Sequence, residues 1–172
     1  MRFALTTVCC LTLCSLPALA QKMKAPMSDQ KFVDFAAQTD MVEAHLGDLA
    51  QNAASSQAVK DYGRMLETDH MQDYQKLQGV AQQAGLNVPN AIDSEHNKAM
   101  IGPMHKLKGA AFDQKFEQNM IAGHTEAIAT YKKEAQDATN PALKAYAQDA
   151  LATLQKHLDD AKALEKGKSP AM

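Results

Sequence analysis

Apolar residues recur at alternating spacings of three and four along most of this chain, and that period constrains its fold more than any other feature. After Ser28 the period runs through Phe32, Val42 and Leu46 to Ala53. Such a stripe is typical of an amphipathic helix that buries one face. The sequence therefore predicts a first helix from Ser28 to about residue 53. Similar stripes predict three more long helices over about 57–84, 111–138 and 141–166.

The residues between the stripes mark the helix ends. Ser28 and Asn140 suit N-cap positions, and Pro141 suits the first position of a helix. Gly85 suits the end of the second helix. Very short turns separate the helices of each pair, whereas a connection of roughly 25 residues joins the second helix to the third. Within that connection, residues 93–107 predict a short helix interrupted at Gly102-Pro103.

Two helical hairpins joined by a crossover that contains a short helix predict an all-α, ferritin-like four-helix bundle. A simple up-down-up-down bundle would show the same four stripes, so the sequence leaves that connectivity open. We expect the bundle domain to span 28–166, between a flexible lead at 21–27 and a frayed tail at 167–172.

Residues 1–20 have the pattern of a secretory signal peptide. Arg2 precedes a short apolar run, and Ala18-Leu19-Ala20 is a small-x-small cleavage sequence. We therefore expect an exported protein, periplasmic or secreted. The cysteines, Cys9, Cys10 and Cys14, all lie in this segment. The mature chain would then lack disulfides and thiolate metal ligands.

Charge and hydropathy restrict the partners. Arg2 is the only charged residue of 1–20, so the remaining chain carries 17 basic and 20 acidic side chains and a formal charge of −3. This small and interspersed charge gives no electrostatic footprint for nucleic acid or anionic lipid. No later apolar run has the length of a membrane span. The sequence does not decide whether the protein binds another protein or forms a homo-oligomer.

Ionisable side chains interrupt the apolar stripes of all four helices. At about 100° per residue, His70, His124 and His157 lie within about 50° of the centres of their stripes. Glu43 and Asp69 lie about 80° and 60° from the centres of theirs by the same geometry. Charged groups are rarely buried unless they are paired or bind a metal. We expect the three histidines to converge near mid-bundle, where Glu43 or Asp69 completes a mononuclear site.

Imidazole and carboxylate ligands suit zinc or another first-row divalent ion better than magnesium or calcium. Asp73 and Asp113 also face inward and are expected to accept hydrogen bonds from the imidazoles and so fix their tautomers. The alternative is a metal-free polar network, because nearby Asp and Tyr residues can satisfy three buried histidines without an ion.

A second group of candidate ligands lies in the crossover. His96, Met100 and Met104 are spaced four apart, and His105 follows directly. Thioether and imidazole ligands together suit copper(I). Pro103 breaks the regular spacing, and methionine commonly fills gaps in a core.

Several motifs of the chain resemble exported bacterial proteins of the domain of unknown function 4142 family, which are often labelled predicted outer membrane proteins. The resemblance covers about 28–166 and implies a ferritin-like bundle without an established activity. The motifs are AHLGDLA at 44–50 after Glu43, Asp69-His70, GAAFDQKF at 109–116, His124, and LATLQKHLDDAKAL at 151–164.

The di-iron pattern of ferritin-like oxidases occurs here only in part. Such sites use Glu-x-x-His on two helices. Glu67 and His70 have that spacing, but Ile121 and Leu154 stand three residues before His124 and His157. Glycine-rich phosphate loops, nucleophile elbows and HExxH motifs are also missing. We predict a binding or structural module rather than an enzyme, with a metal-free structural or stress-related bundle and a di-iron oxidase as alternatives.

Overall fold

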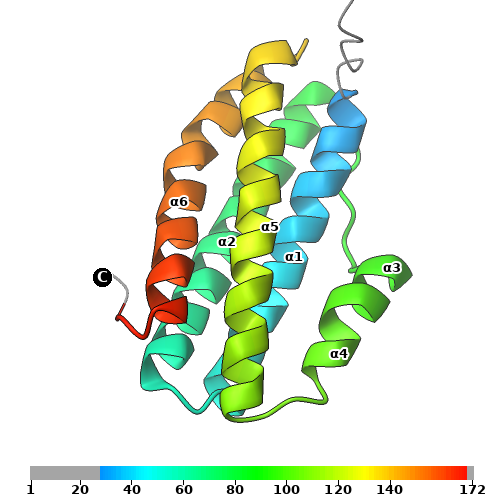
Figure 1. Ribbon diagram of the computed structural model, residues 1–172. Coiled ribbons are helices and arrows are strands. Elements are labelled where there is room, and N and C mark those ends of the chain that lie inside the picture. The colour runs from blue at the N-terminus through cyan, green and yellow to red at the C-terminus, as the bar shows by residue number, and fades with distance from the viewer. Residues whose placement is uncertain (1–27, 170–172) are drawn as a thin grey trace, which may run out of the picture.

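A computed structural model describes residues 28–169, and in this range the chain folds into a four-helix bundle (Figure 1). The expected signal peptide, the lead and residues 170–172 of the tail lie outside the described residues. No helix within the described range is long and apolar enough to cross a membrane. The long helices are α1 (Asp29–Ala53), α2 (Gln57–Ala84), α5 (Ala110–Asp137) and α6 (Pro141–Glu165).

The helices begin and end where the cap residues indicated. The side-chain oxygens of Ser28, Ser56 and Asn140 accept hydrogen bonds from backbone N–H groups in the first turns of α1, α2 and α6. Gly85 ends α2 in the left-handed conformation, with φ at 70°. Local cap chemistry therefore set the boundaries of these helices.

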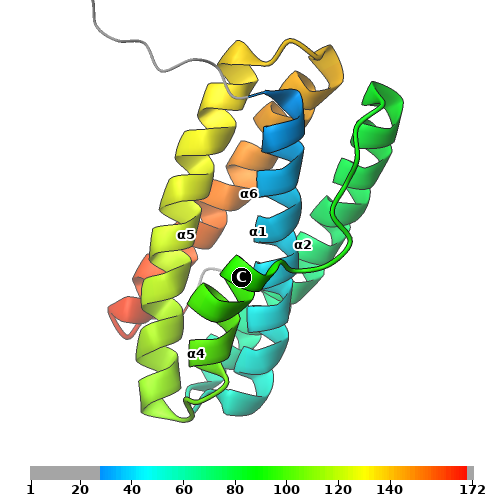
Figure 2. The ribbon, with the colours of Figure 1, turned by 90° about the vertical axis from the view of Figure 1, so that its right-hand side faces the viewer.

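The chain crosses over between its two hairpins. After α2 it runs back beside α1 (Figure 2), so α5 begins at the end of the bundle where α1 finishes. The Gly109 N–H donates to the Ala53 carbonyl at 2.8 Å across this junction. Consequently α2 and α5 run parallel, which confirms the ferritin-like crossover and rules out the up-down-up-down alternative.

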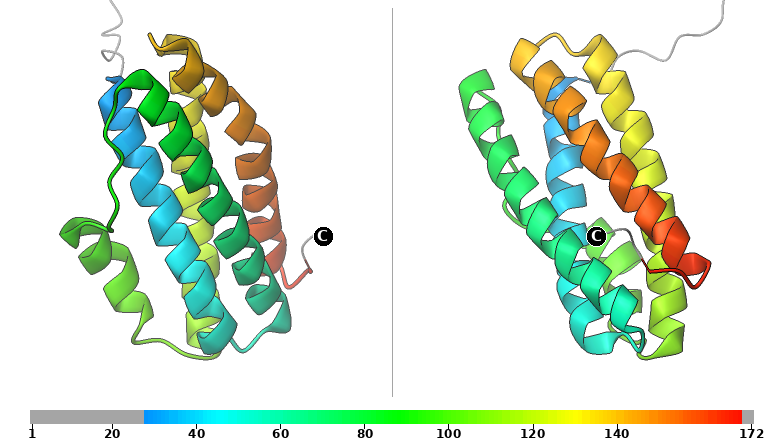
Figure 3. Two further views of the ribbon diagram at one scale, coloured as in Figure 1. Left: turned by 180° about the vertical axis from the view of Figure 1, so that it is seen from behind. Right: turned by 90° about the vertical axis from the view of Figure 1, so that its left-hand side faces the viewer.

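The crossover contains α3 (Ser94–His96), a π-helical turn (Asn97–Ile101) and α4 (Gly102–Met104), which lie beside α1 (Figure 3). The expected interruption at Gly102-Pro103 takes the form of this wide turn, in which the Gly102 N–H bonds to the Asn97 carbonyl. Met104 is fully buried and Ile101 is nearly so. These two side chains attach the crossover to the core.

Two apolar cores occupy opposite halves of the bundle. The polar residues Glu43, His70, His124 and His157 lie close to where their helices pass from one core to the other, so the helices meet in a polar layer at mid-bundle. The Tyr131 core includes Phe32, Leu77, Tyr131, Leu143 and Tyr146. The Phe116 core includes Leu46, Tyr62, Leu66, Phe112 and Phe116.

Candidate metal site

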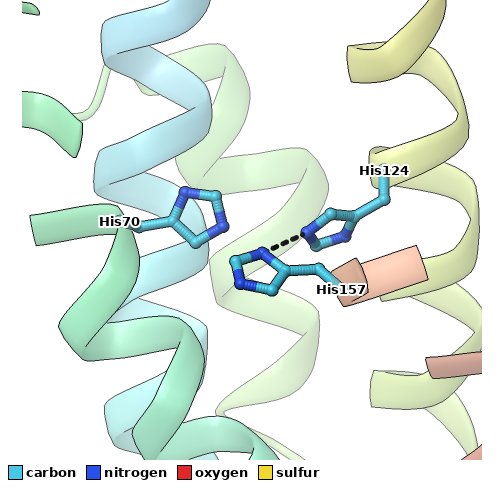
Figure 4. A group of neighbouring side chains, drawn as sticks. All are labelled: His70, His124 and His157. Carbon is cyan, nitrogen blue, oxygen red and sulfur yellow. Dashed lines mark hydrogen bonds between the residues drawn. The ribbon is translucent and has the colours of Figure 1, made fainter. Parts of the chain in front are cut away.

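Each long helix contributes at least one buried ionisable side chain to the polar layer. His70 of α2, His124 of α5 and His157 of α6 are 3%, 0% and 1% exposed, and Glu43 of α1 is 4% exposed. One ring nitrogen of each histidine lies within 4.8 Å of a ring nitrogen of the other two. Figure 4 shows the three rings turned toward one another from their separate helices.

The inward-facing atoms are as close as the ligands of one ion. Glu43 Oε2 lies 2.9 Å from His70 Nε2 and 3.1 Å from His124 Nε2. His124 Nε2 lies 3.1 Å from His157 Nδ1. Ligands held at about 2.0–2.1 Å in a tetrahedron are separated by about 3.3 Å. These three spacings differ from that value by only a few tenths of an ångström, and the other histidine nitrogen pairs lie within 4.8 Å.

Each imidazole uses its other nitrogen to contact an oxygen outside the cluster. A histidine that binds a metal shows the same arrangement, because the outer acceptor fixes the tautomer and leaves the inner nitrogen with its lone pair. The three contacts, each 2.9 Å long, are His70 Nδ1 to Asp40, His124 Nδ1 to the Met120 carbonyl, and His157 Nε2 to Asp69.

Two inward-facing atoms lack a hydrogen-bond partner among the described residues. Glu43 Oε2 and His70 Nε2 are only 2.9 Å apart and form an ion pair when the ring is protonated, but neither atom makes a hydrogen bond of normal geometry. A buried polar atom without a partner costs about 1–3 kcal/mol. A cation between these atoms would satisfy both, so the donor set fits a bound metal ion.

The backbone of α5 makes room for the carboxylate. A Cβ atom at Gly123 would lie 2.9 Å from Glu43 Oε1. That separation is too short for an undisturbed contact. Glycine at this position therefore lets the Glu43 carboxylate lie against α5, next to His124.

Burial and charge shift the pKa values of Glu43 and His70 in opposite directions. Burial raises the pKa of Glu43, but the neighbouring His124 and His70 outweigh it and lower this pKa to about 2. Burial lowers the pKa of His70, but Glu43 and Asp40 outweigh it and raise this pKa to about 10. The described side chains thus hold opposite charges on Glu43 and His70, and a metal ion at His70 Nε2 would have to displace the ring proton.

The other two histidines are kept neutral. Burial lowers the pKa of His124. Burial and the charge of His70 lower the pKa of His157 to about 4. Burial also raises the pKa of Asp40 to about 7, against the opposing effect of His70. Neutral imidazoles keep the lone pairs that a metal ion requires.

The residues that were expected to bind the metal lie close together. The side chains that accept hydrogen bonds from the outer nitrogens of the histidines are not the ones expected. Glu43 touches two of the histidines, whereas Asp69 lies on the outer side of His157. The expectation for Asp73 and Asp113 is wrong. Asp73 accepts a hydrogen bond from the Tyr146 hydroxyl. Asp113 accepts hydrogen bonds from the Ser55 hydroxyl and from the backbone N–H groups of Ser55 and Ser56.

Sequence reasoning missed Asp40, the Met120 carbonyl and Gly123. Asp40 could have been found, because it precedes Glu43 by three residues and so lies on the same face of α1. The Met120 carbonyl and Gly123 act through the backbone, which no side-chain pattern reveals.

The copper(I) candidate in the crossover does not form one cluster. Met104 is fully buried in the Phe116 core, and Met100 packs against the same core. His96 is partly exposed and contacts Asp93 at 2.9 Å, while His105 faces His45 of α1. The π-helical turn and Pro103 shift the positions away from a regular spacing of four, so these side chains point in different directions.

Glu67, the glutamate of the partial di-iron pattern, points away from the histidines. Its carboxylate accepts a hydrogen bond from Gln51 at 2.6 Å. Across residues 28–169, the three histidines are the only group of three or more His, Cys, Asp or Glu residues with the spacing of metal ligands. The described part of the chain thus offers one cluster of three candidate metal ligands.

A cavity connects the cluster with the surface. Its volume is about 550 Å³, and it is lined by residues of α2 and α6, including Asp69, His70 and His157. Asp69 is 37% exposed on its side chain. Two of the three histidines are therefore reachable without unfolding the bundle.

A family model described as a domain of unknown function (DUF4142) matches residues 14–164. No curated protein matches the sequence significantly. Among solved structures, CopM in the Cu(II)-bound form has a TM-score of 0.70 and 16% identity, covering 83% of this chain and 99% of CopM. The Cu(I)-bound and Ag-bound forms of CopM have TM-scores of 0.64 and 0.63, also at 16% identity, each covering 82% of this chain and 97% of CopM. This similarity shows a shared fold.

Proposed function

The chain belongs to the DUF4142 family, and from that premise and the geometry of the polar layer we propose that it is a metal-binding module. His70, His124 and His157 hold one first-row divalent ion, and Glu43 supplies the fourth ligand. Asp40, Asp69 and the Met120 carbonyl orient the three rings.

One observation carries the proposal: atoms from four helices converge at mid-bundle while two of them lack hydrogen-bond partners. Glu43 Oε2 and His70 Nε2 are buried, 2.9 Å apart and unsatisfied among the described residues. A purely structural network would be expected to join them by a hydrogen bond of normal geometry in addition to their opposite charges, since satisfied polar groups are the rule in protein interiors.

The donor atoms favour a divalent ion over a monovalent soft one. Three imidazoles and a carboxylate suit Zn²⁺ and Cu²⁺, whereas thiolate and thioether ligands select Cu(I). Between these two ions, Cu²⁺ generally binds nitrogen and oxygen ligands more tightly. The Cu(II)-bound form of CopM shows that a protein of the same fold takes up this ion. We assign Zn²⁺ or Cu²⁺ to the site.

Access from the surface favours an exchangeable ion. The cavity of about 550 Å³ reaches His70 and His157 from the side of Asp69. A role in binding and releasing a metal therefore fits the site better than a permanently enclosed structural ion.

Elemental analysis of protein purified without an affinity tag tests the proposal. We expect a stoichiometric ion in the wild type and its loss from His124→Ala, His157→Ala and Glu43→Gln, each shown to be folded by circular dichroism. Glu43→Gln keeps the shape of the side chain but removes its charge. His96→Ala, which changes a partly exposed histidine outside the cluster, is the matched control and should keep the ion. Wild-type protein that stays free of metal when offered Zn²⁺ or Cu²⁺ contradicts the proposal.

Oxygen consumption distinguishes this function from a di-iron oxidase. Glu67 is turned toward Gln51, so we expect no more than one iron to bind at the cluster and no oxygen uptake during anaerobic loading followed by aeration. Binding of two irons with oxygen uptake would replace our proposal with the oxidase function.

We further propose that the protein is exported, with cleavage after Ala20. The support is the pattern of Arg2, a short apolar run and Ala18-Leu19-Ala20. Intact-mass measurement of the protein from the periplasm or medium should give a chain beginning at Gln21. A mass that includes residues 1–20, or a diacylglycerol group on Cys14, argues against it.

A further inference from the structure

Two further histidines face each other outside the polar layer. His45 of α1 and His105, the residue after α4, are 60 positions apart in the chain, and their Nε2 atoms are 3.3 Å apart. Their ring centroids are 5.4 Å apart and their planes are inclined by 63°. This pair connects the bundle with the crossover.

Buried neighbours fix both positions. Leu46, next to His45, and Met104, next to His105, are each 0% exposed. The two backbones are thus held by core packing on either side of the pair. His105 itself is exposed and His45 is partly exposed, so solvent reaches both rings.

The spacing of the two nitrogens suits a shared ion. At 3.3 Å one ring can donate a long N–H···N hydrogen bond to the other when no ion is bound. The same spacing equals the separation of about 3.3 Å expected for two ligands of a tetrahedral ion with metal–nitrogen distances of about 2.0–2.1 Å. Among the described residues, the rings make no other hydrogen bond that would restrict which nitrogen faces inward.

We propose that His45 and His105 form a second, surface metal site for Zn²⁺ or Cu²⁺, both of which imidazole suits. The two Nε2 atoms bind the ion, and water fills the remaining positions. With two protein ligands instead of four, this site binds more weakly than the polar layer. A bound ion also links α1 to the crossover. This inference does not depend on the function proposed for the polar layer.

Titration with Zn²⁺, followed by calorimetry, tests the second site on untagged protein. We expect the wild type to bind one further equivalent of Zn²⁺, with a lower affinity than the equivalent in the polar layer. His45→Gln and His105→Gln should each lose it or bind it at least roughly tenfold more weakly. His96→Gln changes a partly exposed histidine of the same crossover; it is the control and should keep this equivalent. Cu²⁺ added beyond the equivalent held in the polar layer should newly broaden the imidazole NMR signals of His45 and His105.

The outcomes for the two sites can be told apart. If the polar layer binds no ion, the wild type should still show one equivalent that His45→Gln removes. The inference is wrong if the wild type shows no weaker equivalent. It is also wrong if His45→Gln and His105→Gln keep that equivalent, or if His96→Gln loses it to the same degree.

Discussion

Glu43 connects α1 with two other helices in the polar layer. Its Oε2 atom contacts imidazoles of two other helices, and its Oε1 atom lies 2.9 Å from the position that a Cβ of Gly123 would take. The position of one carboxylate therefore depends on both the charges around it and the absence of a side chain on α5.

Replacing Gly123 by alanine should weaken metal binding without unfolding the protein. The new methyl group would come within 2.9 Å of Glu43 Oε1 and push the carboxylate out of place. Because Glu43 is a flexible side chain, we expect the bundle to adjust while metal affinity falls roughly tenfold or more. Competition with a chelator measures the affinity.

Gly79→Ala is the matched control for this substitution. A Cβ at Gly79 meets no atom within 4 Å. Alanine there should raise stability by about 0.5–1 kcal/mol through helix propensity and leave metal affinity unchanged. Equal affinities for the Gly123→Ala and Gly79→Ala proteins would show that Glu43 is not a ligand.

Glu134 should make the protein less stable as pH rises. It is 2% exposed, and its Oε1 atom has no hydrogen-bond partner among the described residues. Burial, followed by repulsion from Asp29, raises its pKa from 4.5 to about 7. Between these two pH values the unfolded chain releases a proton that the folded protein retains, so stability falls as pH rises through this window and the loss is complete above it.

We therefore expect Glu134→Gln to be more stable than the wild type by about 1 kcal/mol at pH 8, with the advantage shrinking toward pH 4. Urea unfolding at several pH values measures the difference. Glu126→Gln, at an exposed position of the same helix, should show no such trend. A stability difference for Glu134→Gln that does not change with pH would contradict the ionisation argument.

The direction in which a side chain points around its helix could be predicted from the sequence. Its depth along the bundle was harder to predict. His70, His124 and His157 fall close to the centre of the stripe and also near mid-helix, so both coordinates indicated convergence. Asp113 also faces inward, yet it lies in the first turn of α5 and binds the α1–α2 turn at Ser55. Angular position alone could not separate these two environments.

At the scale of helices, boundaries could be predicted because caps act locally, as Ser28 and Asn140 show. The sequence did not decide whether α5 runs parallel or antiparallel to α2, because an apolar stripe has the same pattern in both orientations. The crossover settles that direction through nonlocal contacts, such as the burial of Met104 and the bond from Gly109 to Ala53.

The α1–α2 contact should tolerate no side chain at Gly63. A Cβ there would lie 2.7 Å from Ala50 Cβ and 2.7 Å from the Gly47 carbonyl oxygen, so the two helices would have to separate. Overpacking of this kind typically costs 1–3 kcal/mol and exceeds the helix-propensity gain of about 1 kcal/mol. We expect Gly63→Ala to lower the free energy of unfolding in urea, whereas Gly79→Ala raises it. Equal gains for both substitutions would show that the helices can move apart freely.

At the scale of the whole molecule, the bundle consists of two apolar cores separated by a polar layer. The Tyr131 core and the Phe116 core would each bury their stripes without any histidine. Unsatisfied polar atoms in the layer lower stability, but their fixed partners also favour one alignment of the four helices over others. We infer that the polar layer makes the folded protein somewhat less stable but holds the four helices in the one alignment that suits metal binding.

A bound ion should therefore stabilise the entire bundle, because its ligands come from all four long helices. Binding to the folded state alone adds about 2.7 kcal/mol when the free ion is at a hundred times its dissociation constant. For a domain of this size, that free energy corresponds to a rise in Tm of roughly 5–10 °C. Calorimetry with Zn²⁺, Cu²⁺ or a chelator should show this rise in the wild type and in His96→Ala, but not in His124→Ala. If neither added ions nor a chelator changes the Tm of the wild type, the three histidines form a metal-free polar network, with His70 held between Asp40 and Glu43.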